Sequence, residues 1–424
     1  MKKLLLLVSL LCGLTITIFP QNINGRFTSA IYSFERFDTL GSSATYGRTY
    51  QMLYMTFGKD NVSLKTYLNL EGDIAQSISY DPRLRFYNLY LVVKRLWNTV
   101  YFKLGRQPLF NSAAGGVFDG LTLGLKYAGI DIYGYYGGNV PAYQKFEVTN
   151  DFNNDYVAGG KLTVHSITNM RIALSYINKN FRIPSYTATR LDANLNPITV
   201  LIANNSRQYE YISADASYDL PKTFRVDTRY EYDLNFSTTS KFEISGRYEE
   251  IENLGLSVYY NYRQPRIRYN SIFSVFDYGN TQEIEFGGDY LIAGKYKVIG
   301  KFGNVSYKDD NSQRVTLGIS SPWGTISGRK TFGYAGELNS ISLYTAQTIL
   351  DGLLTPSFGF SYTRYRLEED VSANEMTTLL LGLNYRPIRT LSFDVQGQYM
   401  NNKIYKNDYR LLAKLNFWFN ANFK

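Results

Sequence analysis

The stretch KLGRQPLFNSAAGGVFDG, residues 103–120, joins a strand-like run to a Gly-containing loop. Such loops bind phosphate when a helix N-terminus follows them, because its free N–H groups and dipole then point at the anion. Here residues 121–127, LTLGLKY, instead alternate as a strand does. Neither G-x-G-x-x-G nor G-K-[ST] is present. We therefore exclude a nucleotide site and interpret residues 103–120 as a long connection between two strands.

Other residues capable of chemistry are few. His165, followed by Ser166, is the single histidine, so any Ser–His hydrolase site would have to use it. It follows the strand-like run KLTV, where a histidine is ordinarily a solvated end residue, and no carboxylates cluster near it in the sequence. The single cysteine, Cys12, lies in an apolar N-terminal run, so the rest of the chain has no disulfide or thiolate metal site. The sequence thus predicts no enzyme activity, no cofactor and no metal site.

The N-terminus has the pattern of a secretory signal peptide. Lys2 and Lys3 precede the apolar residues 4–19 and Pro20, and this run is shorter than the roughly 20 residues of a spanning helix. Leu11 stands before Cys12, where a lipoprotein signal would need a small residue. We expect residues 1–20 to be the signal, with cleavage between 20 and 25, and residues 21–424 to form one domain.

A period of two dominates that domain. In TFRVDTRYEY, residues 223–232, apolar side chains and Thr228 occupy one face and charged side chains the other. Successive side chains of a strand point to opposite faces, so the run predicts a strand with one apolar and one charged side. The same alternation recurs at residues 241–249, 283–290 and 296–302.

Short and long connections alternate between these runs. The short ones are residues 58–61, 220–222, 292–295 and 386–389; the long ones include 138–155, 179–207, 263–279 and 364–375. Strands of about ten residues joined in this way are typical of outer-membrane barrels, which leave no backbone group unpaired in lipid. We predict an all-β, transmembrane, antiparallel up-and-down β-barrel of about 22 strands, in a range of roughly 18–24, without a plug domain. A soluble propeller is the alternative, but its repeat of roughly 40–50 residues is missing.

The composition agrees with a barrel in a membrane. The chain has 39 Tyr and 26 Phe, whereas charged residues make up only 19%. Aromatic side chains at strand ends form the girdles at the two interfaces of such barrels. The net charge of +9 is spread over single Lys and Arg residues, so we expect no nucleic-acid partner.

Two segments resemble known proteins. Residues 409–424, YRLLAKLNFWFNANFK, resemble the aromatic-rich last strand of Gram-negative outer-membrane barrel proteins, although they end in Lys424 rather than an aromatic residue. The arrangement LGRQ…FDGL, residues 104–121, is similar to segments of porin-like barrels, including alginate-export-type channels. The resemblance implies the outer membrane, contact with lipid and lipopolysaccharide, and folding by the barrel-insertion machinery. The arginine-lined alginate pore is not carried over, because both charge signs occur on the predicted inner face.

The first functional hypothesis is a porin-like channel for ions or small hydrophilic solutes. Its predicted pore-lining residues are the charged members of the alternating runs: Arg225, Asp227, Arg229, Glu231, Lys241, Glu243, Arg247, Glu249, Glu283, Glu285, Asp289, Lys297 and Lys301. These residues could select solutes by charge, or simply solvate a lumen and pair across strands. The alternative function is a scaffold or sheath for a separate protein in the lumen, such as an export or electron-transfer component.

The longest connection, residues 179–207, contains an aliphatic run that is unusual for a solvated loop. Three arrangements are open: a hairpin that extends the wall, a binding tip, or a loop that folds inward and constricts the pore beside the arginines of residues 263–279. The constriction candidates are Ile198, Val200, Leu201, Ile202, Arg263, Arg266 and Arg268.

Overall fold

The computed structural model describes residues 21–37, 43–74, 83–110, 115–182, 185–202, 208–269, 271–308, 310–333, 336–366, 371–403 and 406–423. The predicted signal peptide, residues 1–20, lies outside the described residues.

The described chain forms 24 strands and two short 3₁₀ helices. The strands are β1 (Asn22–Phe37), β2 (Ser43–Lys59), β3 (Val62–Asp73), β4 (Arg83–Leu96), β5 (Val100–Phe110), β6 (Gly115–Tyr127), β7 (Ile130–Asn139), β8 (Tyr156–Val164), β9 (Met170–Asn180), β10 (Tyr186–Leu191), β11 (Pro197–Ile202), β12 (Tyr209–Leu220), β13 (Phe224–Asp233), β14 (Thr238–Tyr248), β15 (Leu254–Arg263), β16 (Thr281–Ile292), β17 (Tyr296–Tyr307), β18 (Asp310–Ser321), β19 (Gly324–Gly333), β20 (Gly336–Ala346), β21 (Leu354–Arg366), β22 (Asn374–Ile388), β23 (Leu391–Asn401) and β24 (Asn407–Asn422). The helices are η1 (Ala142–Gln144) and η2 (Ile272–Val275). No described helix is long and apolar enough to cross a membrane.

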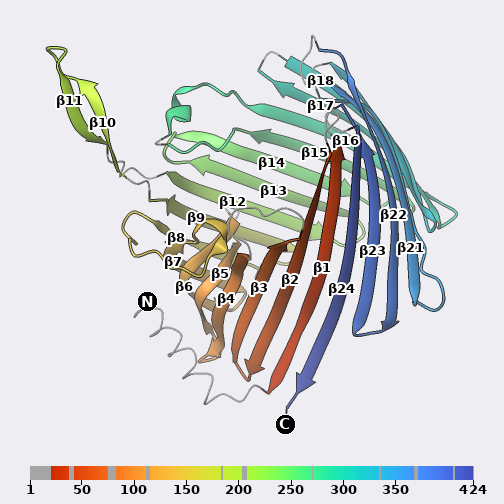
Figure 1. Ribbon diagram of the computed structural model, residues 1–424, viewed down its shortest axis with the longest axis horizontal. Coiled ribbons are helices and arrows are strands. Elements are labelled where there is room, and N and C mark those ends of the chain that lie inside the picture. The colour runs from red at the N-terminus through yellow and green to blue at the C-terminus, as the bar shows by residue number, and fades with distance from the viewer. Residues whose placement is uncertain are drawn as a thin grey trace.

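Twenty-two of the strands form one closed antiparallel sheet. Closure is made by β1, which pairs with β2 on one side and with β24 on the other, in a register that runs from Asn22 opposite Asn422 to Phe37 opposite Asn407. Strand β9 pairs directly with β12, so β10 and β11 form a separate two-stranded hairpin (Figure 1). The predicted all-β, up-and-down barrel of about 22 strands is therefore confirmed.

The two ends of the barrel differ in their connections. Tight turns join β2 to β3 and β16 to β17 at one end, and Asp60 in the first of them has a φ of 49°. Both described termini lie at this short-turn end, where the Gln21 N–H donates to the Gly58 carbonyl (2.9 Å) and the Phe423 N–H to the Gln21 carbonyl (2.7 Å). The long connections, including the one between β7 and β8, lie at the opposite, long-loop end.

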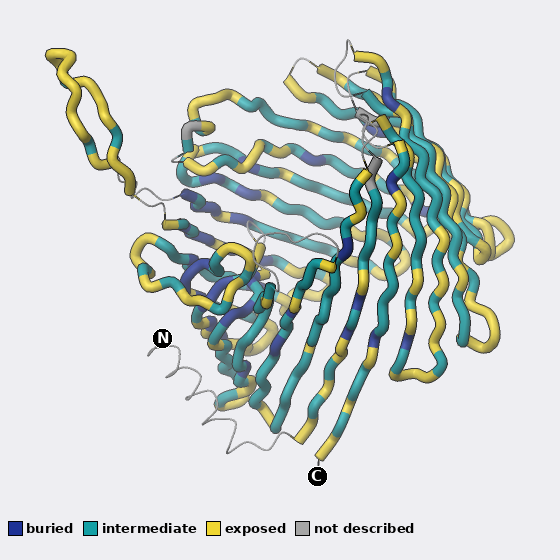
Figure 2. Tube along the Cα trace, in the orientation of Figure 1, coloured by how far each residue is buried: buried dark blue, intermediate teal, exposed yellow. Residues whose placement is uncertain are grey.

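The wall has the two faces that the alternation predicted. On β6, Leu121, Leu123 and Leu125 point outward with 46%, 56% and 40% of their surface exposed, whereas the intervening Thr122 is 5% exposed. Large apolar side chains such as Phe286, Leu317 and Leu381 are likewise exposed on other strands of the barrel, whereas most buried side chains lie between β5 and β14 (Figure 2). An apolar outer surface of this extent suits hydrocarbon rather than water.

Candidate functional site: the narrowed lumen

The ends of β5 and β6 at the long-loop end fold into the barrel. We call described residues 106–110 and 115–119 the lumen hairpin. Its Leu109 and Phe118 belong to a buried cluster in which no member is more than 7% exposed. The other members lie on the inner faces of β7, β8, β9 and β12: Tyr135, Val157, Ile177 and Tyr211. A barrel wall is a single layer and cannot by itself bury side chains that point into the lumen this completely. The lumen hairpin therefore covers the inner faces of β7, β8, β9 and β12 at the cluster.

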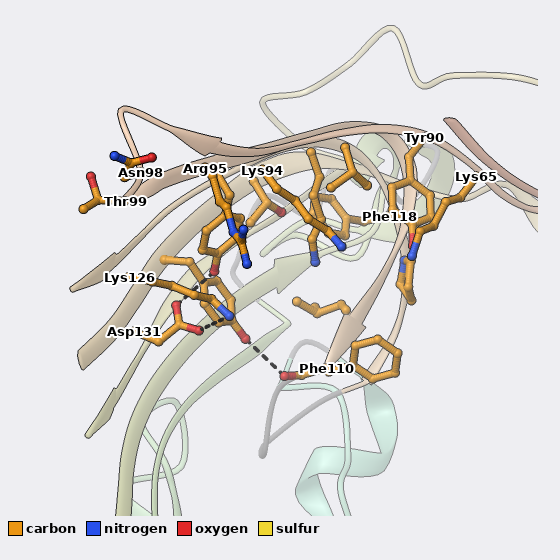
Figure 3. Close-up of a pocket in the computed structure, with 17 residues that line it drawn as sticks. Lys65, Tyr90, Lys94, Arg95, Asn98, Thr99, Phe110, Phe118, Lys126 and Asp131 are labelled. Atoms are coloured by element: carbon orange, nitrogen blue, oxygen red, sulfur yellow. Dashed lines mark hydrogen bonds and ion pairs between the residues drawn. The ribbon is translucent and has the colours of Figure 1, made fainter. Parts of the chain in front are cut away.

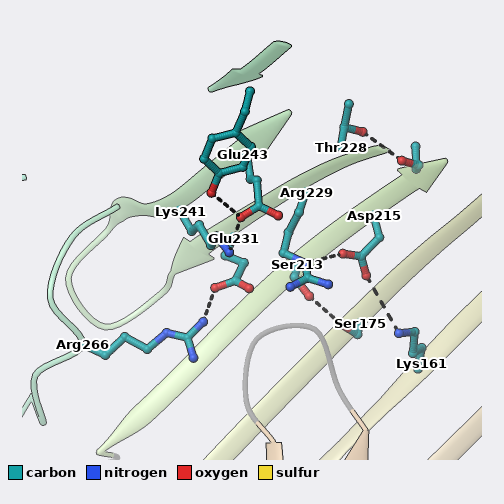
Figure 4. Close-up of polar contacts among 12 residues, drawn as sticks. Lys161, Ser175, Ser213, Asp215, Thr228, Arg229, Glu231, Lys241, Glu243 and Arg266 are labelled. Carbon is teal, nitrogen blue, oxygen red and sulfur yellow. Dashed lines mark hydrogen bonds and ion pairs between the residues drawn. The ribbon is translucent and has the colours of Figure 1, made fainter. Parts of the chain in front are cut away.

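The tip of the lumen hairpin extends to the charged part of the wall. Leu109, Phe110 and Gly115 line a cavity of about 370 Å³ together with charged residues of five strands. Those charged residues are Lys161, Arg171, Asp215, Asp227, Arg229 and Glu243. Several of them are drawn in Figure 4, where their side chains lie on one face of neighbouring strands. The charged face is therefore the face toward the lumen.

Glycines lie at the base of the lumen hairpin, where β5 loses its pairing with β4 after Arg106 while β6 stays paired with β7 as far as Phe118. Gly105 has a φ of +117°, and a Cβ there would lie 2.4 Å from the Leu89 carbonyl oxygen. A Cβ on Gly120 would lie 2.6 Å from the Gly137 Cα atom. Only glycine combines this backbone conformation with such a close approach of neighbouring strands.

A buried ion pair holds the other face of the lumen hairpin. The Arg106 guanidinium donates to both carboxylate oxygens of Asp119, at 2.8 and 2.7 Å, and the two side chains are 5% and 7% exposed. Arg106 also donates to four backbone carbonyls, which belong to Phe86, Gln144, Lys145 and Glu147 at 2.7–3.1 Å. One side chain therefore connects β4, the lumen hairpin and the β7–β8 loop, and such bidentate charged contacts are strong.

The β7–β8 loop is fixed in turn by amide side chains. The Asn139 side chain donates to the Asn180 carbonyl (2.6 Å) and to Asp155 (2.7 Å), while the Asn180 side chain donates to the Asn154 carbonyl (2.9 Å). Phe146 of this loop packs on Phe86 of β4, with ring centroids 4.6 Å apart. The loop therefore supports the lumen hairpin from the long-loop side.

Each predicted pore-lining residue has a partner of opposite charge within 4 Å. On β13 and β14, Arg225 pairs with Asp227 (2.7 Å) and Lys241 with Glu243 (2.8 Å). Arg247 contacts both Glu249 (2.5 Å) and Asp289 (2.9 Å). On β16 and β17 the expected acidic and basic rows do pair, through Lys297 with Asp289 and Lys301 with Glu285, each at 2.8 Å.

Some partners come from residues that the sequence analysis did not single out. Asp215 on β12 accepts from Arg229 (2.8 Å) and lies 3.9 Å from Lys161, as Figure 4 shows. Glu283 pairs not with a lysine of β17 but with Arg314 of β18. Asp215 and Arg314 lie in alternating runs as well, so their face could have been predicted by extending the period of two to β12 and β18.

The inward-folding hypothesis requires both the arginines and the aliphatic run to lie inside the barrel, and this holds only for part of the arginines. The Arg266 side chain reaches Glu231 on the inner wall and stacks over the Tyr211 ring at 5.4 Å. Arg263 is the last residue of β15, and the carbonyl of Arg268 accepts from the Ser271 N–H. Through Arg266, the connection that follows β15 therefore reaches the inner wall beside the buried cluster.

The aliphatic run takes the hairpin arrangement instead of constricting the pore. Ile198, Val200, Leu201 and Ile202 belong to β11, which pairs with β10 in a hairpin that extends away from the barrel in Figure 1. Ile198 and Leu201 are 42% and 62% exposed. The backbone N–H and C=O groups of β10 and β11 hydrogen-bond to each other, so the hairpin needs no strand of the wall. In its turn, the Asp192 carboxylate accepts hydrogen bonds from the N–H groups of Asn194 and Asn196. Hydrogen bonds from Asn196 and Asn194 lower the pKa of Asp192.

The remaining candidates for chemistry stand apart from the lumen hairpin. His165 and Ser166 are exposed in the turn between β8 and β9. The stretch after Gly120 is the strand β6, as predicted, and no helix follows the loop. Within the described ranges, no three His, Cys, Asp or Glu residues are grouped so that they could hold a metal ion.

The comparisons with known proteins give structural likenesses only. No known protein family and no curated protein matches the sequence. Among solved structures, the outer-membrane protein OpdK of Pseudomonas aeruginosa is 7% identical, with a TM-score of 0.42, over 95% of this chain and 100% of that one. A BenF-like porin of Pseudomonas fluorescens Pf-5 is 9% identical (TM-score 0.43, 94% and 99% covered), and OccAB3 of Acinetobacter baumannii is 10% identical (TM-score 0.40, 94% and 99% covered). The barrel itself rests on this chain's own strand pairing.

Proposed function

We propose that the protein is an outer-membrane channel for passive, weakly selective passage of ions and small hydrophilic solutes. The observation that carries this proposal is the lumen hairpin, which narrows a closed barrel of 22 strands from within. A barrel of that width is otherwise filled by a plug. Cavities of about 700 and 370 Å³ adjoin the lumen hairpin, which supports a narrowed rather than a filled lumen.

The charge pattern supports weak selectivity. On the wall formed by β12–β18, the pore-lining cations are each paired with a carboxylate. The fields of paired opposite charges largely cancel, and salt screens what remains over a Debye length of about 8 Å at physiological ionic strength. This part of the wall therefore repels neither cations nor anions strongly.

The test is conductance in planar lipid bilayers after purification in detergent. We expect discrete current steps in KCl from the unboiled protein, and none from protein unfolded by boiling. A folded barrel that inserts but never conducts would contradict the channel and favour the sheath for a partner protein.

A further inference from the structure

The cavity of about 700 Å³ lies on the inner faces of β3–β7. Leu109, Phe110 and Phe118 of the lumen hairpin line one end of it, and Asn98 and Thr99 of the tight β4–β5 turn line the other. Figure 3 shows the lining side chains directed into this space. We call it the basic cavity; it lies between the lumen hairpin and the short-turn end of the barrel, where a solute passing the hairpin would enter it.

Positive charge dominates the basic cavity. Its lining includes Lys65, Lys94, Arg95, Lys103 and Lys126, against one carboxylate, Asp131. Among the described residues, only Lys126 of these five cations is in an ion pair, with its Nζ 3.0 Å from Asp131. The wall of β12–β18 differs, because its pore-lining cations are paired. Grouped cations without carboxylate partners raise the local concentration of anions.

The one carboxylate of the basic cavity is already engaged. Asp131 accepts a hydrogen bond from the Tyr101 hydroxyl (3.1 Å) in addition to its contact with Lys126. Tyr133, also in the lining, donates its hydroxyl to the Phe110 carbonyl (3.2 Å), which ties this wall to the lumen hairpin. The lining is thus positioned by contacts of its own, and four cations are left to face the space.

We propose that the basic cavity binds small solutes that carry two or more negative charges, such as phosphate esters or polycarboxylates. A single negative charge would offset one of the four cations that lack a carboxylate, whereas a multivalent anion can contact several at once. The volume is in the range of sites for small molecules, which is roughly 300–1,000 Å³. This inference rests on the proposed channel function, because it places the site on the permeation path.

The experiment measures single-channel current in KCl at about physiological ionic strength while citrate or pyrophosphate is added. We expect either anion to interrupt the current, and neutral glucose and monovalent acetate to leave it unchanged. Removing two cations in the double variant Lys65→Gln/Lys103→Gln should raise the half-blocking concentration by about tenfold or more. The matched control is Lys222→Gln/Lys295→Gln, which removes two exposed lysines from the β12–β13 and β16–β17 turns and should change the half-blocking concentration by less than about twofold.

The outcomes separate this inference from the proposed function. Block by citrate alone, or by pyrophosphate alone, supports the site and identifies the anion class. A conducting channel that neither anion blocks, or equal weakening by both double variants, would overturn the site and leave the channel intact. Absence of any current in KCl would instead count against the channel itself.

Discussion

Replacing Asp119 by asparagine should loosen the lumen hairpin for part of the time. Asp119 lies opposite Arg106 within the hairpin, and a buried Arg106 without its counter-charge gains by moving to water, away from the carbonyls of Phe86 and of the β7–β8 loop. Asparagine keeps the shape of the side chain but leaves the Arg106 guanidinium, which is 5% exposed, without its counter-charge. Breaking a buried ion pair from one side costs about 3–5 kcal/mol. Since each 1.4 kcal/mol is tenfold, the equilibrium between docked and undocked hairpin should shift by roughly two to three and a half powers of ten.

This free-energy cost is comparable with the contribution of the buried apolar side chains that hold the lumen hairpin in place. Leu109 and Phe118, at 7% and 1% exposure, contribute about 1.5–3 kcal/mol each by burial. We therefore expect Asp119→Asn to add a state of higher conductance, with flicker between the two levels. The double variant Arg106→Met/Asp119→Leu leaves no unpaired charge, so it should flicker less than the single variant.

The assay is single-channel recording, with a gel-mobility test that each variant is folded. The control is Asp227→Asn, which breaks the exposed pair with Arg225 and should add no conductance state, because exposed pairs contribute little. A folded Asp119→Asn channel with one unchanged conductance level would refute the role assigned to the buried pair.

The remaining predictions concern the barrel, its charges and its glycines. The mature protein should migrate faster unboiled than boiled in detergent gels and give β-type circular dichroism, because the closed sheet of 22 strands resists detergent; solubility without detergent would contradict this. Neutralising Arg229 and Arg247 leaves Asp215 and Asp289 in excess on the inner wall, so the reversal potential in a KCl gradient should shift toward cation selectivity. That shift should fade as salt rises to about 1 M, where the screening length is about 3 Å, and a shift of the same size at all salt concentrations would argue against a lumenal position. Gly105→Val should destabilise the folded barrel, because its Cβ would meet the Leu89 carbonyl at 2.4 Å and its φ is +117°; a variant that unfolds at the same temperature as the native protein would show that the bend is not needed.

The wall of the barrel could be predicted from the sequence because its determinant is local. In TFRVDTRYEY the side of the sheet that each residue occupies follows from its parity alone, and the structure places Arg225, Asp227 and Arg229 on one face as predicted. The last strand, β24, likewise keeps its apolar positions outward, with Leu411 52% exposed.

The interior of the barrel could not be predicted in the same way. From the sequence we interpret residues 103–120 as a connection, but residues 103–110 and 115–120 belong to the strands β5 and β6. Nothing local marks Gly105 as the level beyond which β5 leaves the wall. The position of these residues depends on contacts between distant segments, such as Arg106 with the carbonyls of residues 144–147. For the aliphatic run of β11 the sequence left three arrangements open, because apolar composition does not reveal that its strand pairs with β10 rather than with the wall.

The most direct test of the narrowed channel compares two deletions by single-channel conductance and by the size of neutral polymers that enter the pore. Replacing residues 107–118 with a short Gly–Ser link removes the tip of the lumen hairpin, and replacing residues 186–202 in the same way removes the outer hairpin of β10 and β11. We predict that the first deletion raises both the conductance and the polymer cutoff, while the second changes neither. Unchanged values for the first deletion in a folded barrel, or a rise with the second alone, would contradict the assignment of the constriction to the hairpin of β5 and β6.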